Sequence, residues 1–105
     1  MDLEAAAGEL GLERDEFLEL LTLFLDTAAG DLASLKAAVG AGDAKTAAVA
    51  AHSLKGAALN LGFMELGHAA REVEVAAKGA RLADAGEHLV ALEGKLQDLA
   101  QACRP

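Results

Sequence analysis

Apolar residues recur every three or four positions along almost the whole chain, and the only proline is the last residue, Pro105. Because an α-helix has 3.6 residues per turn, this spacing gathers apolar side chains on one face of a helix. Glycines, rather than prolines, separate the periodic blocks, at Gly40-Ala41-Gly42, Gly62 and Gly79-Ala80. Strand-like alternation is absent. The pattern therefore predicts an all-α fold.

The blocks predict four long amphipathic helices joined by short loops. We expect them at residues 14–39, 43–61 and 64–78, with the fourth starting at a capping box formed by Asp84 and Glu87. Such helices bury their apolar faces most simply as an antiparallel up-down-up-down bundle. We expect residues 1–12 to add a short helical segment that covers the off-stripe Leu20 and Leu23. The prediction is one domain over residues 1–105, with the bundle at 13–103.

Composition excludes several functional classes. The net charge is −8, only three residues are aromatic, and the single cysteine is Cys103. An acidic chain poor in aromatic residues is a poor binder of nucleic acid. No apolar run is long enough to span a bilayer, and the start of the chain is acidic where a signal peptide is basic. We therefore expect a cytoplasmic monomer that binds neither nucleic acid nor membrane.

One histidine lies away from the apolar stripe of its helix. On a helical wheel His52 lies about 130° from the centre of the stripe of residues 43–61. Its neighbours on that face are Lys45, Ala48, Val49, Lys55, Gly56 and Leu59. The interpretation is an exposed imidazole among small apolar residues, with two lysines and no carboxylate within reach on its own helix.

These neighbours exclude some of the reactions that a histidine can carry out and favour others. A histidine-dependent hydrolase needs an orienting carboxylate and a nucleophile, and neither lies one turn from His52. Metal binding needs further ligands, but His68 and His88 fall on other helices. Nearby lysines favour a neutral imidazole, which can attack, and they attract a phosphoryl group once it is attached. Because helical side chains lean toward the N-terminus, Gly56 leaves the space beside His52 clear.

The segment from Ala51 to Gly62, AHSLKGAALNLG, resembles the H-x-L-K-G-x-x-x-x-x-G signature of histidine-containing phosphotransfer (HPt) domains. FLELL at 17–21, the Gly42-Asp43 turn and the Val73-Glu74 pair are similar to other parts of that family. The resemblance implies that His52 accepts a phosphoryl group from a receiver-domain aspartyl phosphate and passes it to another receiver. It further implies that Lys55 supports the phosphoryl group and that Gly56 keeps the approach open. From their position beside His52 we expect Lys45, Ala48, Val49 and Leu59 to form the docking surface.

The same resemblance implies that the catalytic residues belong to the receiver domain. No glycine-rich phosphate loop follows a strand, so we expect a phosphoryl carrier, not an enzyme, with no cofactor of its own. The Mg²⁺ needed for transfer is then expected on the receiver. Two alternatives stay open: a non-catalytic helical adaptor in which His52 is incidental, and the phosphotransfer module of a larger hybrid or chemotaxis-type kinase. Ala57 and Ala58 depart from the family, because many members carry serines there.

Overall fold

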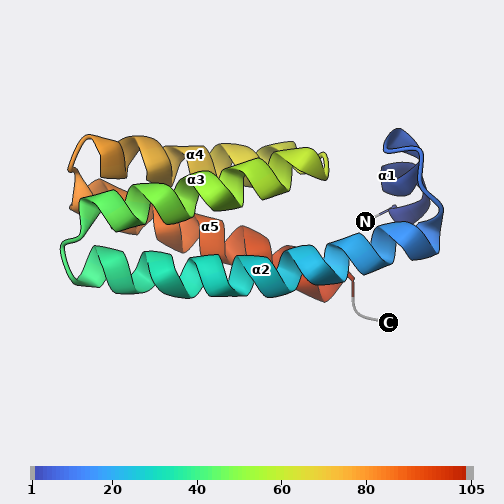
Figure 1. Ribbon diagram of the computed structural model, residues 1–105, viewed down its shortest axis with the longest axis horizontal. Helices are drawn as coiled ribbons and strands as arrows, with labels where there is room; N and C mark the ends of the chain where they lie inside the picture. Colours follow the sequence, from blue (N-terminus) through green and yellow to red (C-terminus); the bar gives the residue numbers. More distant parts are fainter. Residues whose placement is uncertain (1, 104–105) are drawn as a thin grey trace.

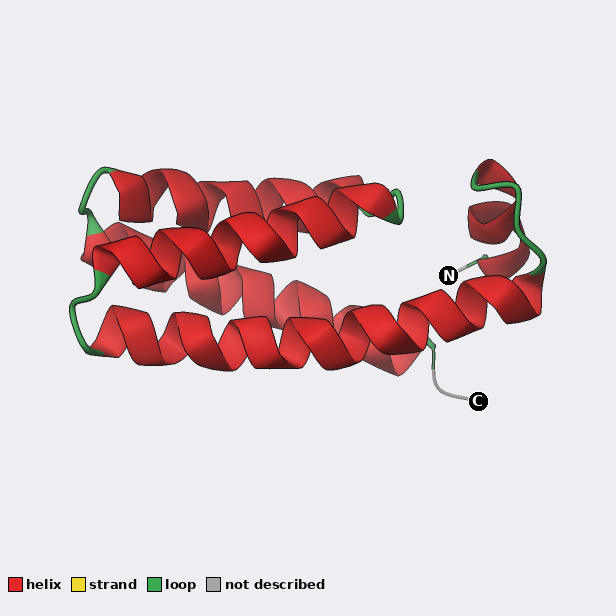
Figure 2. Cartoon of the chain, in the orientation of Figure 1, coloured by secondary structure: helices red, strands yellow, loops and turns green. Residues whose placement is uncertain are grey.

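The computed structural model describes residues 2–103, so Met1, Arg104 and Pro105 lie outside it. These residues form helices and no strand (Figures 1 and 2). The prediction of an all-α fold is confirmed. The helices are α1 (Leu3–Glu9), α2 (Arg14–Gly40), α3 (Ala44–Asn60), α4 (Met64–Lys78) and α5 (Leu82–Ala102).

Four long helices lie side by side along an elongated molecule of 42 × 22 × 17 Å. From α2 to α5 each helix contacts the next along the chain, and α2 also contacts α5. The ribbon reverses direction at each short loop between them (Figure 1). The short helix α1 contacts α2 and lies at its N-terminal end. The α3–α4 hairpin therefore forms one side of the molecule.

The core consists mainly of leucine, alanine and phenylalanine side chains. The largest fully buried ones come from α2, α3, α4 and α5: Phe17, Leu21, Leu35, Leu54, Val73 and Leu92. Phe63, in the α3–α4 loop, packs its ring edge-on against Phe17 at a centroid distance of 6.2 Å, and at a tilt of 55° against Phe24 at 5.8 Å. Removing this apolar surface from water is the main force that holds the helices together.

Small residues bring α3 and α4 close together. The buried face of α3 consists of Leu54 and alanines, and α4 presents Gly67 to Leu59 of α3. A Cβ at Gly67 would clash with the end of the Leu59 side chain. This close packing fixes the relative position of the two helices that carry the candidate site.

The observed start agrees with the predicted start to within one residue for three of the four long helices, α2, α3 and α4. Asp43 caps α3, accepting the backbone N–H of Thr46 at 3.1 Å. The predicted capping box at Asp84 and Glu87 is wrong, because α5 already begins at Leu82. The turn that closes α4 leads directly into α5. Arg81 is the N-cap of α5, and its backbone N–H donates to the carbonyl of Ala76 in α4 at 2.9 Å.

The predicted role of the N-terminal segment is also wrong. Leu20 and Leu23 remain 41% and 64% exposed. Helix α1 has only seven residues, and it buries Ala7 at the start of α2 without extending along the outer face of that helix.

The turn after α4 contains a left-handed alanine. Helices α2, α3 and α4 end in the same motif, in which a residue with positive φ follows the C-cap: Gly42, Gly62 and Ala80. Alanine at φ 57° is strained by its Cβ, whereas glycine is not. We expect Ala80→Gly to raise the free energy of unfolding by about 1 kcal/mol, as measured by urea denaturation. Ala91→Gly, in the middle of α5, is the matched control and should lower it by about the same amount.

Candidate functional site

His52 lies in the middle of α3 with its side chain 66% exposed. Its Nδ1 atom is 2.7 Å from Oε2 of Glu74, a residue of α4. An ionised carboxylate can only accept hydrogen bonds, so the proton of a neutral ring lies on Nδ1. The lone pair is then on Nε2, the nitrogen that Glu74 does not hold.

The partner of His52 is a buried charge. Glu74 is only 3% exposed, and each of its oxygens has a donor. Lys55 Nζ lies 2.7 Å from Oε1, and Lys78 Nζ lies 3.2 Å from Oε2. Burial acts to raise the pKa of Glu74, but hydrogen bonds from Lys55, His52 and Lys78 outweigh it and lower that pKa to about 2. The carboxylate is therefore ionised at neutral pH.

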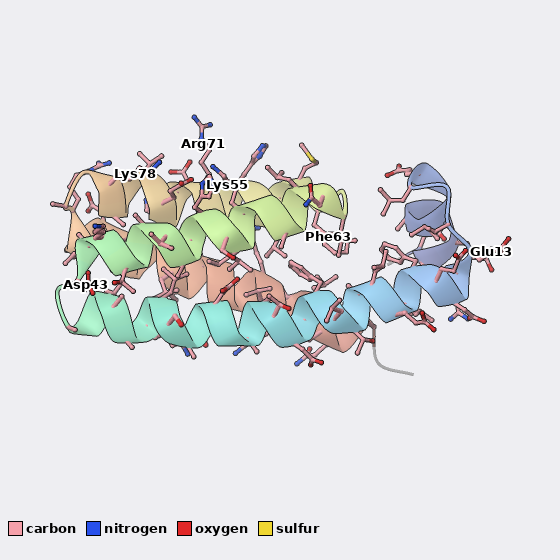
Figure 3. The ribbon with its side chains drawn as sticks, in the orientation of Figure 1. Glu13, Asp43, Lys55, Phe63, Arg71 and Lys78 are labelled. Atoms are coloured by element: carbon pink, nitrogen blue, oxygen red, sulfur yellow. The ribbon has the colours of Figure 1, made fainter. Side chains whose placement is uncertain are left out.

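The packing of α3 on α4 explains how this carboxylate meets the ring. Glu74 lies four residues after Ala70 and three before Ala77, on the buried face of α4. Its oxygens pair with Lys55 of α3 and with Lys78 of α4. Both lysines lie on the side of the molecule formed by these two helices (Figure 3). The arrangement is an exposed nucleophilic nitrogen whose opposite nitrogen is held by a fixed negative charge.

A family model named Hpt domain matches residues 19–102, which is most of the chain. The chain belongs to the Hpt domain family. The resemblance stated from the sequence is thereby confirmed, and Hpt domains act as histidine phosphocarriers that interact with receiver domains. Comparisons with curated proteins and with solved structures each gave no match.

Glu74 is the residue of this Hpt domain that sequence reasoning missed. No carboxylate lies one turn from His52 on its own helix, because the orienting carboxylate comes from the next helix, 22 residues later. A signal was present: Glu74 lies among the apolar positions 70, 73 and 77 of α4. A carboxylate in such a stripe must be paired, because an unpaired buried charge is strongly destabilising. Glu74 also neutralises Lys55, which the sequence had suggested as a free cation facing the ring.

Three of the four predicted docking residues of the Hpt domain are on its surface, and one is not. Lys45 is exposed, Val49 is 64% exposed and Leu59 is 37% exposed. The docking role of Ala48 stays a prediction, but its side chain is only 9% exposed and belongs to the hydrophobic core instead of the outer face of α3. The physical reason is that neighbouring helices pack over this flank of α3, which the wheel of a single helix does not include.

Gly56 is not required by packing. A Cβ at this position would meet no atom within 4 Å, although glycine inside a helix costs about 1 kcal/mol relative to alanine. We expect Gly56→Ala to stabilise the Hpt domain by up to about 1 kcal/mol and to slow phosphoryl transfer from a receiver severalfold, because the methyl group leans toward His52. Gly94→Ala, also in open space within a helix, is the control that should stabilise without slowing transfer. Equal transfer rates in the two variants would contradict the clearance role.

The other groups that the sequence singled out lie apart from His52. His68 is exposed on α4, and His88 Nε2 on α5 lies 3.9 Å from a Glu72 oxygen. Cys103 packs against the core, and burial raises the pKa of its thiol. Within residues 2–103 no group of three or more His, Cys, Asp or Glu side chains is arranged to hold a metal ion. None of the helices in this part of the chain is both long and apolar enough to cross a membrane.

Proposed function

We propose that this Hpt domain carries a phosphoryl group on Nε2 of His52 within a two-component phosphorelay. The observation that supports this most strongly is the exposed ring whose Nδ1 is held by the buried Glu74 carboxylate. The Nε2 lone pair attacks the phosphorus of a receiver aspartyl phosphate. The bond between phosphorus and the aspartyl oxygen breaks, and the aspartate leaves with the electron pair. The reverse step delivers the group to another receiver.

Glu74 stabilises the product of the attack. A ring that keeps its Nδ1 proton and gains a phosphoryl group on Nε2 carries a formal positive charge. The Glu74 carboxylate, 2.7 Å from Nδ1, is placed to balance that charge without rearrangement. This is the role that a buried carboxylate has beside a catalytic histidine in a hydrolase triad.

Lys55 is proposed as the support of the phosphoryl group. Its ammonium has three N–H donors, and its described contact with Oε1 of Glu74 uses one of them. The remaining donors are available to a phosphoryl oxygen, with the lysine already held near the ring. Gly56 is proposed to keep the approach to Nε2 open.

The docking surface is proposed to span α3 and α4. Lys45, Val49, His52, Gly56 and Leu59 follow one another on α3 at spacings of four and three residues. The exposed residues Met64, His68, Arg71, Val75 and Lys78 repeat this spacing on α4. Among residues 2–103, four of the eight exposed large hydrophobic residues lie on these two stripes. Neither stripe contains an acidic residue, so the surface complements the carboxylates around the phosphorylation site of a receiver.

The proposal extends to the topology of the bundle, the extent of the domain, and its localisation and cofactor need. We infer that α2 to α5 form an antiparallel up-down-up-down bundle within a single domain, residues 13–103, preceded by the 1–12 segment. The short loops and the contact of α2 with α5 support this topology. We expect the domain to act as a cytoplasmic monomer that needs no cofactor of its own, with Mg²⁺ bound by the receiver.

The test is phosphoryl transfer from a phosphorylated receiver. The label should move to the Hpt domain and be lost in acid but retained in alkali, as for a phosphorus–nitrogen bond. An acid-stable label would contradict the proposal. A receiver that binds tightly yet transfers nothing would identify the domain as a helical adaptor instead.

A further inference from the structure

Two cations share the carboxylate oxygen that holds His52. Oε2 of Glu74 accepts from His52 Nδ1 at 2.7 Å and from Lys78 Nζ at 3.2 Å, whereas Oε1 accepts from Lys55 Nζ at 2.7 Å. Lys78 and Glu74 are four residues apart on α4, so the helix itself brings them together. His52 and Lys78 therefore share one acceptor oxygen.

The shared oxygen lowers the proton affinity of the His52 ring. The carboxylate favours a protonated imidazole, and a second donor on the same oxygen weakens that attraction. The Lys78 charge adds to the effect, because its Nζ and the His52 Nδ1 are no more than about 6 Å apart when both contact Oε2. We propose that Lys78 is a positioning residue that acts through Glu74 to lower the proton affinity of the His52 ring, so that Nε2 stays free to attack. The consequence for transfer rests on the function proposed above.

The other charged groups around His52 do not share the Glu74 oxygen with the ring as Lys78 does. On α3, Lys45 lies two turns away, and Lys55 is bound to the other oxygen of Glu74. On α4, Arg71 shares the exposed stripe. On α2, Asp31 accepts from the Ser53 hydroxyl at 3.2 Å. Among the hydrogen bonds and ion pairs of residues 2–103, Lys78 is the cation that shares an oxygen with the ring.

The first test is an NMR titration of the His52 ring in the whole chain. Lys78→Met should move the midpoint of this titration upward by about half a pH unit, since removing a charge at about 6 Å near a surface has an effect of this size. Lys78→Arg should restore the midpoint. Lys95→Met, which removes a lysine 4.0 Å from a Glu65 oxygen on another face, should leave it unchanged. An unmoved midpoint in Lys78→Met would overturn the inference.

The second test measures reactivity without a receiver. Phosphoramidate donates its phosphoryl group directly: the Nε2 lone pair forms the new bond to phosphorus, the phosphorus–nitrogen bond breaks, and ammonia leaves. The acid limb of the pH–rate profile should move upward in Lys78→Met and return in Lys78→Arg, with the plateau rate changed less than about twofold. A rate lowered equally at every pH would show a merely structural role for Lys78 and contradict the inference.

The two tests separate this inference from the proposed function. If the wild-type chain takes up no phosphoryl group from any donor, the proposed function fails, and the NMR titration still decides whether Lys78 acts on the ring. If the chain is phosphorylated normally and Lys78→Met changes neither profile, the function stands and the role of Lys78 is wrong. Because the Lys78 side chain is 66% exposed, its replacement should leave the fold intact.

Discussion

The His52→Gln variant should take up no phosphoryl group from a phosphorylated receiver, although it should fold like the wild-type chain. The glutamine amide has no nucleophilic nitrogen, because its lone pair is delocalised into the carbonyl. Its N–H can still donate to Glu74, so the buried carboxylate keeps a partner. Transfer of label measures the loss, and circular dichroism with thermal unfolding measures the fold.

A histidine outside the site serves as the matched control for this result. His88→Gln makes the same change on α5, away from Glu74 and from both docking stripes. This variant should still accept the phosphoryl group from a receiver. Label retained on His52→Gln, or lost only from His88→Gln, would remove His52 from the role of acceptor.

Glu74→Gln should reduce the rate of phosphorylation of His52 by about 100-fold or more, because replacing the residue that orients a metal-ligating histidine already costs about 10- to 100-fold. The amide presents either a donor or a neutral acceptor to Nδ1, so it no longer fixes the proton there or balances the charge formed during attack. Glu72→Gln, on an exposed face of the same helix, is the control and should transfer at the wild-type rate. An unchanged rate in Glu74→Gln would show that the carboxylate is not used in transfer.

The same variant should have a stability defect that depends on pH. The pKa of Glu74 is lowered from 4.5 to about 2 by its donors, against the opposing effect of burial. A lowered pKa means that the stabilisation is complete above pH 4.5 and disappears as the pH falls through 2. The shift corresponds to about 3 kcal/mol. Urea denaturation should therefore show a large difference between the wild-type chain and Glu74→Gln at pH 7 that shrinks steadily from pH 4.5 to pH 2.

The helices of this Hpt domain follow from local sequence. Spacing of apolar residues placed α2 and α4 to within a residue, and Asp43 and Gly62 marked the ends of α3. The start of α5 did not follow, because Ala80 takes the left-handed conformation that sequence rules assign to glycine. The position of α1 did not follow either, since nothing in its seven residues specifies where along α2 it packs.

The candidate site was predictable on the histidine helix and not beyond it. A wheel identifies His52 as exposed because the angle depends on that helix alone. Whether Ala48 is covered, and whether Glu74 reaches the ring, depends on how α4 packs against α3. Leu59 resting on Gly67 sets that packing, and a helical wheel contains no information about it.

Within residues 2–103, the side chains that form hydrogen bonds or ion pairs with Glu74 all belong to one helical hairpin, from Ala44 to Lys78. The reactive ring and its carboxylate are only 22 residues apart, so the loop that must close to join them is short. Closing a short loop costs less chain entropy than closing a long one, so this contact is inexpensive to form. The geometry of the reactive ring therefore depends directly on the α3–α4 hairpin, whereas α2 and α5 act on it indirectly, by packing against α3 and α4.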